Sequence, residues 1–327
     1  NYYLWLNSIL EFIWKYWIKN IKFIDYQVSY IKLKKHTGKI IRKYGRFQII
    51  NCKNCKFIHI NPIPTNEELE NFYENDYYQK TKPNYITGNE KDIEYQNYTF
   101  DEKLDFLEKK FTKKTRRILD IGSGPGFFLR RAKKRGWKVL GIEPSPIASK
   151  YSEKQKIPTI QKFFHDVNVK ECGKFDAIHT FDVLEHVNDP ISVLKKSYSL
   201  LKKGGIIIIE VPNDFNPLQK IIQKSLKKKE YWVTDSSKSK KFDHINYFDF
   251  SSISKLVEKL GFKIILKEST FPLEFFILMG HDYIKNPKIG KKIHLERVKF
   301  ENNFKSDDSK EIKRILYQKF AEAGIGR

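Results

Sequence analysis

Two patterns of apolar and polar residues alternate through the middle of the chain: short apolar runs and apolar residues at helical spacing. Short apolar runs predict buried strands at residues 116–121, 137–142, 159–161, 175–180 and 205–211. Apolar residues recur at helical spacing between them, at 126–135, 146–155 and 189–201. The near-continuous run at 206–209 is typical of a strand buried on both faces of a parallel sheet. We therefore expect an α/β fold with a doubly wound sheet.

Segments on either side extend this pattern. Residues 100–111 predict a helix before the first strand, and residues 251–266 predict a helix, a break at Gly261 and a last strand. Residues 74–99 are polar and rich in tyrosine, which indicates a mobile connection, either a linker or a lid over the site. Beyond the apolar stretch at 271–279, the sequence predicts charged helices to residue 327.

The chemistry begins where the first strand ends. Asp120 closes that strand and is followed by a loop containing Gly122, Gly124 and Gly126, after which a helix begins. Such glycines let the backbone approach a ligand closely, and the helix offers unpaired N–H groups. Glu143 ends the next strand, where an acid can accept hydrogen bonds from both hydroxyls of a ribose. The loop lacks the GxGxxG spacing of dehydrogenases, which favours S-adenosylmethionine (SAM) over NAD.

Four motifs in order carry a resemblance to a known family. They are Asp120-Ile-Gly-Ser-Gly-Pro-Gly126, Gly141-Ile-Glu-Pro-Ser145, residues 175–187 and residues 200–213. Over residues 100–268 the chain resembles the class I SAM-dependent methyltransferases. The resemblance implies a Rossmann-like sheet and SAM as cofactor. It also implies that the cofactor is held by Asp120, Gly122, Gly124, Gly126 and Glu143. Phe181 and Asp182 are then expected to line the part of the site that holds its methionine moiety.

Two histidines are the candidate catalytic bases. The sequence His244-Ile-Asn-Tyr-Phe-Asp-Phe-Ser251 resembles an element of sugar and natural-product methyltransferases, which implies that His244 faces the acceptor. In some relatives a tyrosine three residues earlier works with this histidine, and that position is occupied by Lys241 in this chain. His186 lies in Asp182-Val-Leu-Glu-His186, similar to an element that binds a divalent ion in some quinone and RNA-end methyltransferases and is also common in metal-free ones. A structural hydrogen-bonding role for His244 stays open, as does a role for His186 in capping or bracing the following helix.

A CxxC pair precedes the α/β region. Cys52-Lys-Asn-Cys55, the proline turn at 61–65 and the helix ending in Phe72-Tyr73 resemble half of the zinc-ribbon-like segment of some sugar and natural-product methyltransferases. The upstream CxxC pair is absent, and His36-Thr-Gly38 stands in its region. His36 and His59 could complete a Cys2His2 set, since a structural zinc site needs four ligands. The sequence leaves zinc binding open, and we assign no metal ligand from it.

Charge and composition constrain the partners. The chain has 62 Lys and Arg against 39 Asp and Glu, but only 10 of the basic residues are Arg. Base and phosphate recognition usually depends on arginine, so we expect a small-molecule acceptor rather than nucleic acid. The lysine-rich insertion at 212–243, with Tyr231 and Trp232, is either a solvated loop or a cap for an anionic acceptor such as a nucleotide sugar.

Residues 1–24 predict an aromatic helix with a charged face. This helix either packs on protein or lies on a membrane surface, which would give a peripheral membrane contact. With three cysteines and no signal-peptide pattern, we expect a cytoplasmic protein that is open to membrane association. The sequence does not fix its oligomeric state.

The predicted organisation has three parts. Residues 1–99 carry the aromatic helix, the degenerate zinc-ribbon-like α+β segment and the lid or linker. Residues 100–270 form the SAM-dependent methyltransferase domain, and 271–327 form a helical C-terminal extension. We expect methyl transfer to a small-molecule or carbohydrate-linked acceptor. The alternatives are an RNA methyltransferase and a non-catalytic SAM-fold scaffold at a membrane or partner surface.

Overall fold

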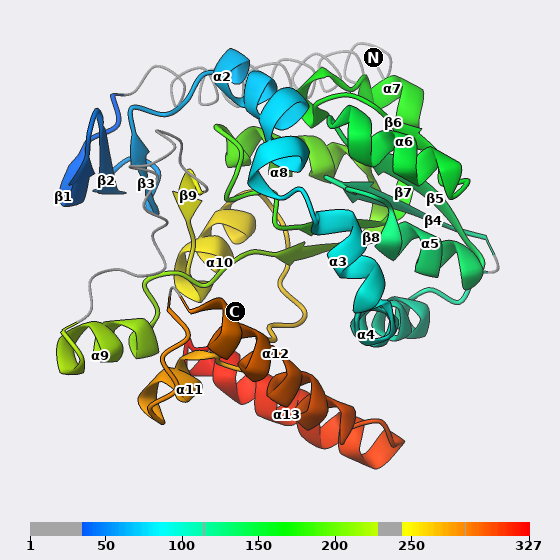
Figure 1. Cartoon of the computed structure of the whole chain (residues 1–327). Helices are drawn as coiled ribbons and strands as arrows, with labels where there is room; N and C mark the ends of the chain where they lie inside the picture. The colour runs from blue at the N-terminus through cyan, green and yellow to red at the C-terminus, as the bar shows by residue number, and fades with distance from the viewer. Residues whose placement is uncertain (1–34, 114, 228–243, 285) are drawn as a thin grey trace, which may run out of the picture. The chain divides into compact units, whose positions relative to one another are not determined.

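The computed structural model describes residues 35–113, 115–227, 244–284 and 286–327 (Figure 1). The aromatic helix expected at residues 1–24 lies outside these ranges, as do Tyr231, Trp232 and Lys241. The chain divides after Asn61 into two compact units. The predicted domain boundaries at 99 and 270 remain predictions.

The first unit contains an antiparallel meander. Its strands are β1 (Gly38–Tyr44), β2 (Phe47–Cys52) and β3 (Ile58–Asn61), with β2 paired to both neighbours. Ile49, Ile50 and Ile60 are almost completely buried and supply its apolar core. The strand-like character predicted around Cys52 and Cys55 is therefore confirmed.

The second unit is built on a five-stranded parallel sheet (Figure 1). Its strands are β4 (Arg116–Ile121), β5 (Trp137–Ile142), β6 (Thr159–Ile160), β7 (Phe175–Phe181) and β8 (Leu201–Glu210). Their order in the sheet is β6-β5-β4-β7-β8, so the chain runs outward from β4 to β6 and returns to place β7 on the other side of β4. Ligands of such sheets bind at the carboxyl edge where the order reverses.

Helices connect the strands. They are α4 (Ile93–Lys110), α5 (Phe127–Lys134), α6 (Pro146–Lys154), η2 (Phe164–Asp166), α7 (Val169–Cys172), α8 (Pro190–Leu200), α9 (Pro217–Ser225) and α10 (Phe250–Lys259), with the short strand β9 (Asn246–Tyr247) before the last. Those predicted at 100–111, 126–135, 146–155, 189–201 and from residue 251 are present, whereas η2, α7, α9 and β9 were not predicted. Leu104 and Leu107 of α4 are buried in one core cluster with Ile118 of β4 and Leu129 of α5. Burial of each such leucine contributes roughly 1.5–3 kcal/mol to folding, which fixes α4 and α5 to the sheet.

The segment before α4 is more regular than the sequence indicates. The helix expected before Phe72-Tyr73 is present as α2 (Asn66–Asn71), and the stretch that predicted a mobile connection contains the π-helix η1 (Phe72–Thr81) and α3 (Tyr85–Lys91). Thr65 and Glu68 cap the start of α2 reciprocally. The tyrosines that suggested a polar linker pack on one another, with ring centroids of Tyr77 and Tyr78 5.0 Å apart and those of Tyr78 and Tyr85 5.6 Å apart. Aromatic packing therefore orders this segment.

The C-terminal region is helical, as predicted. It contains α11 (Glu274–Leu278), α12 (Pro287–Asn302) and α13 (Asp307–Glu322). The strand predicted after Gly261 is wrong, because residues 262–272 take no regular structure. The amides of Ser269 and Thr270 donate to the carbonyl oxygens of Tyr317 and Arg327, so this end of the segment bonds to the C-terminal region. Within the described ranges, no helix has the length and apolar character needed to cross a membrane.

Candidate active site

The glycine loop between β4 and α5 is shaped by its packing as well as by its turn. Gly122 and Gly126 have φ of +69° and +79°, a region that residues with a Cβ rarely adopt. A Cβ on Gly122 would lie 2.4 Å from Val183, and one on Gly126 would lie 2.6 Å from Ser152. Gly124 is different, because the atom nearest to the position that a Cβ would take is the hydroxyl of Tyr78, 3.3 Å away.

Glu143 is held directly against this loop. It follows β5, which pairs in parallel with β4, and its side chain is almost fully buried. The backbone N–H groups of Gly124 and Ser145 each donate to one of its carboxylate oxygens at 2.8 Å. Burial raises the pKa of Glu143 to about 7, with a smaller contribution from the charge of Asp120. The carboxylate therefore has fixed oxygens with lone pairs left for two ribose hydroxyls.

A chain of charged groups begins at Asp120, the residue before the loop, and runs from buried His179 to the half-buried Glu210 and Lys103. Nδ1 of His179 lies 2.7 Å from Oδ1 of Asp120, and Nε2 lies 3.0 Å from Oε1 of Glu210. Nζ of Lys103 lies 3.1 Å from the other oxygen of Glu210. Burial alone would lower the pKa of His179, but the two carboxylates outweigh burial and raise that pKa to about 9. His179 is therefore charged at neutral pH and holds Asp120 in one orientation.

Sequence reasoning missed His179 and Glu210. The available signal was a polar residue within the apolar strand β7, in the position that pairs with Asp120 of β4. Recognising it required knowing that these two strands are neighbours, although they lie far apart in the sequence.

Two tyrosines of the segment before α4 lie against the cofactor-binding candidates. Burial raises the pKa of Tyr85 to about 12, and the charges of Asp182, Glu143 and Asp120 add to this rise. Burial also raises the pKa of Tyr78 well above its usual value, with the charge of Glu143 next in importance. Tyr85 is thus within electrostatic reach of all three predicted carboxylates, and Tyr78 is within reach of Glu143.

Phe181 and Asp182 leave the carboxyl end of β7. Phe181 is 44% exposed, which leaves its ring available for contact. Asp182 has φ of +53°, and its Oδ1 accepts a hydrogen bond from the Arg327 side chain at 2.7 Å. Asp182 also contributes to the raised pKa of Glu185, whose main cause is burial. Asp182 therefore lies between the cofactor-binding candidates and a second group of side chains.

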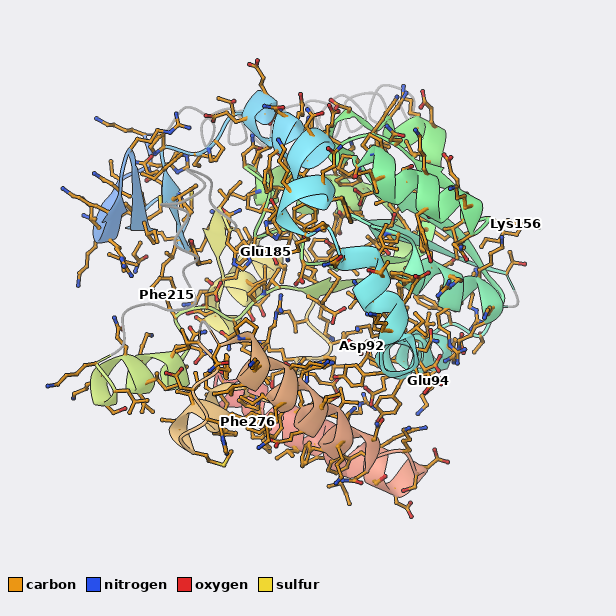
Figure 2. All side chains as sticks on the ribbon, viewed as in Figure 1. Asp92, Glu94, Lys156, Glu185, Phe215 and Phe276 are labelled. Atoms are coloured by element: carbon orange, nitrogen blue, oxygen red, sulfur yellow. The ribbon has the colours of Figure 1, made fainter. Side chains whose placement is uncertain are left out.

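That second group contains both predicted bases. Ligand atoms of Glu185, His186 and His244 lie within 4.8 Å of one another, and the two histidine rings are 5.0 Å apart (Figure 2 labels Glu185). Nδ1 of His244 lies 3.5 Å from a carboxylate oxygen of Asp214. Such a group can move a proton or hold a divalent ion.

Backbone contacts explain how His244 reaches His186. The amides of Ile245 and Asn246 both donate to the carbonyl oxygen of Glu185, at 2.7 and 3.0 Å. The side-chain amide of Asn246 donates to the carbonyl oxygens of Leu184 and Val187. These four bonds attach the segment after residue 243 to the loop that follows β7. Asp189, rather than His186, caps α8, so His186 has no capping role.

The residues present fit SAM. The positive φ of Gly122 and Gly124 shapes the loop at the carboxyl edge of the sheet, where ligands bind, and buried Glu143 offers a paired acceptor for a ribose diol. Carboxylates suit the positively charged sulfonium and amino groups of this cofactor. Phe181 offers an apolar wall beside them.

Comparisons with known proteins agree with this fit. Residues 93–267, more than half of the chain, match the family model described as "Methyltransferase domain". The ubiquinone biosynthesis O-methyltransferase of Actinobacillus pleuropneumoniae serotype 7 is 32% identical over 125 residues, which cover 34% of this chain and 52% of that protein. The Coxiella burnetii (strain Dugway 5J108-111) protein of the same name is 30% identical over 117 residues, covering 34% and 50%.

The chain thus spans about half the length of the curated relatives it matches. Among solved structures, a SAM-dependent methyltransferase from Archaeoglobus fulgidus has a TM-score of 0.43 and 21% identity, covering 57% of this chain and 78% of that one. The chain belongs to the methyltransferase domain family, and the cofactor of its α/β domain is S-adenosyl-L-methionine.

Proposed function

We propose that this protein transfers the methyl group of SAM to a small-molecule or carbohydrate-linked acceptor, with His244 as the base that receives the acceptor's proton. The observation that carries the proposal is the pairing of His186 and His244, whose rings lie 5.0 Å apart in one group with Glu185, on which the charge of Asp182 acts. A base placed next to the cofactor-binding candidates suits transfer to a group that must lose a proton.

The residues at the glycine loop bind SAM and orient it toward the acceptor. SAM supplies a methyl carbon on a positively charged sulfur, which keeps the bonding electron pair as the methyl passes to the acceptor. Glu143 holds the ribose through its two carboxylate oxygens, and Asp120 and Asp182 orient the amino-acid end. Correct orientation of two reactants supplies roughly 7–11 kcal/mol of the barrier reduction. Tyr78 lies against Gly124 of the loop and its ring packs on that of Tyr85, which supports a lid role for this segment.

The proton of an acceptor hydroxyl passes to Nε2 of His244. We assign Nε2 as the proton acceptor because the other ring nitrogen, Nδ1, lies 3.5 Å from the carboxylate of Asp214. The carboxylate of Asp214 then stabilises the imidazolium that forms. A base of this kind contributes about 10²- to 10⁴-fold in rate. The ring of His186 packs beside that of His244. The alternative to a proton-accepting His244 is a divalent ion bound by Glu185, His186 and His244.

The acceptor class rests on three considerations. The curated relatives are named O-methyltransferases, which favours oxygen as the methylated atom. Lys220 and Lys224 are exposed on α9, in the insertion after β8, which supports an anionic acceptor such as a nucleotide sugar. Lysine-dominated charge does not favour RNA as the substrate. Contact with a membrane through residues 1–24 stays a prediction, as does the cytoplasmic location.

The test is a transfer assay with radiolabelled SAM and a panel of nucleotide sugars and small hydroxylated acceptors. We expect a product with wild type and with the control His294→Ala, and a 10²- to 10⁴-fold slower reaction with His244→Ala. Retained binding of S-adenosylhomocysteine (SAH) by His244→Ala would show that only proton transfer was lost. Full activity of His244→Ala would refute the assigned base, and activity abolished by dialysis against a chelator and restored by Mg²⁺ would favour the divalent ion.

A further inference from the structure

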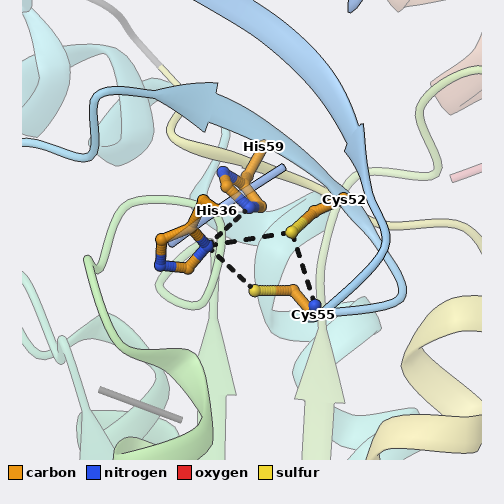
Figure 3. Close-up of side chains that lie close together, drawn as sticks. All are labelled: His36, Cys52, Cys55 and His59. Carbon is orange, nitrogen blue, oxygen red and sulfur yellow. Dashed lines mark hydrogen bonds between the residues drawn. The ribbon is translucent and has the colours of Figure 1, made fainter. Parts of the chain in front are cut away.

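Four potential metal ligands converge in the first unit (Figure 3). His36 lies just before β1, Cys52 ends β2, Cys55 lies in the turn between β2 and β3, and His59 lies on β3. Their side chains point toward one another in Figure 3. None of them belongs to the site described above.

The distances match those of a tetrahedral zinc site. Nδ1 of His36 lies 3.2 Å from Nε2 of His59, 3.3 Å from Sγ of Cys55 and 3.8 Å from Sγ of Cys52. With Zn–N of about 2.0–2.1 Å and Zn–S of about 2.3 Å, tetrahedral geometry separates two nitrogens by about 3.3 Å and nitrogen from sulfur by about 3.6 Å. All four ligand atoms lie within 4.8 Å of one another.

The local backbone holds the two sulfurs in place. The amide of Cys55 donates to Sγ of Cys52 at 3.4 Å, and the amide of Lys56 donates to the carbonyl oxygen of Cys52 at 3.0 Å. Lys56 has φ of +67°, which turns the chain back toward β3. An N–H group aimed at sulfur favours the thiolate, which is the form that binds a metal.

The orientation of His59 supports the same conclusion. Its Nδ1 donates to the carbonyl oxygen of Ile60 at 2.7 Å, so the proton is on Nδ1 and the lone pair of Nε2 faces the cluster. Such a bond to the second ring nitrogen is the usual support of a metal-bound histidine. His59 is 1% exposed, as is Cys52, so these two ligands are shielded from water, whereas His36 and Cys55 are half-buried.

Charge and size give a reason for a metal at this position. Two thiolates would balance the charge of one Zn²⁺, and two sulfurs with two nitrogens form a set that selects zinc. Between residues 35 and 61, the part of the unit that the structure describes, the core is built on three short strands, and cores of this size commonly depend on a bound metal. We propose that His36, Cys52, Cys55 and His59 bind one structural Zn²⁺ that stabilises the β1–β3 meander.

The test measures the metal content of the full chain and its spectrum after substitution with Co²⁺. We expect about one zinc per chain, and a cobalt form with thiolate charge-transfer absorption and tetrahedral ligand-field bands. Cys55→Ser and His36→Asn should each lose the zinc and this spectrum. Cys172→Ser is the matched control, because this buried cysteine lies on α7 in the other unit, and it should keep both.

A wild-type chain with well under one zinc, and no tetrahedral cobalt spectrum on titration, would overturn the proposal. Zinc retained at full stoichiometry by both Cys55→Ser and His36→Asn would also overturn it. Binding of SAH is measured in every variant, since the second unit should still bind if only the meander is affected. A variant that has lost SAH binding has failed to fold as a whole. If both variants fail in this way, the cobalt spectrum of the wild-type chain decides whether the zinc site exists.

Discussion

Nδ1 of His179 and Oδ1 of Asp120 lie 2.7 Å apart in the interior of the sheet, and the ring of His179 stacks on that of Phe128 at 4.0 Å. Both side chains are almost fully buried. The buried histidine is charged because it also contacts Glu210. The cofactor-binding candidate Asp120 therefore depends on a residue that no ligand needs to touch.

The first prediction concerns the pH dependence of stability. Contact with two carboxylates raises the pKa of His179 to about 9, above its ordinary value of 6.5, so its charged form favours the folded state. This contribution is fully present below pH 6.5 and is lost as the pH rises through about 9. We expect the free energy of unfolding to fall by a few kcal/mol across this range, measured by urea denaturation.

His179→Gln should remove most of that fall, because glutamine can bond to both carboxylates but carries no titrating charge. His165→Gln is the control, since His165 is on the surface segment after β6 and is 41% exposed. An equal loss of stability between pH 6.5 and 9 in wild type and His179→Gln would contradict the assigned charge.

The second prediction concerns Glu143 and the affinity for SAH. Burial raises the pKa of this carboxyl to about 7, and only the carboxylate can accept hydrogen bonds with both oxygens. The dissociation constant should therefore decrease as the pH rises from 6 to 8. Glu143→Gln should bind at least tenfold more weakly at pH 8 and lose the pH dependence, whereas exposed Glu153→Gln on α6 should behave like wild type. A flat profile for the wild-type protein would refute this role.

The third prediction concerns the glycine loop. Gly122→Ala places a Cβ 2.4 Å from Val183 at a φ of +69°, so it should destabilise the fold by about 2 kcal/mol or more and weaken SAH binding. Gly290→Ala is the matched control, because nothing lies within 4 Å of its Cβ position in α12. Thermal unfolding of both variants checks this, and similar midpoints would show that the loop tolerates a side chain.

The fourth prediction concerns the tyrosine-rich segment. If Tyr85 covers the bound cofactor, Tyr85→Ala should speed the dissociation of SAH about tenfold or more while the fold is retained. Stopped-flow displacement measures this rate. Tyr198→Ala, which removes a 52% exposed ring on α8, is the control. An unchanged rate in Tyr85→Ala would leave the segment without a lid function.

The sequence predicts the parts of this structure that depend on local pattern. The strand before Asp120, the glycine loop and the position of Glu143 follow from short apolar runs and from glycines that a tight turn requires. The contact between His179 and Asp120 could not be predicted in this way, because it arises from the order of strands in the sheet. The same holds for Asn246, whose bonds to Leu184 and Val187 bring His244 to His186.

Errors in the prediction have a related cause. The polar, tyrosine-rich sequence around Tyr78 predicted a mobile connection, either a linker or a lid, and did not predict the helices that its packed aromatic rings order. The helix and the break at Gly261 suggested a following strand, yet the amides of Ser269 and Thr270 bond to the C-terminal region. In both segments, contacts with residues distant in the sequence decided the structure.

The central claim, that this chain binds SAM through the loop after β4, is tested most directly by calorimetric titration of SAH. We expect binding in the low micromolar range for wild type and for the exposed control Asp308→Asn, and at least tenfold weaker binding for Asp120→Asn. Circular dichroism confirms that each variant is folded. Absence of binding to a folded wild-type protein would contradict the claim and favour a non-catalytic role for the fold.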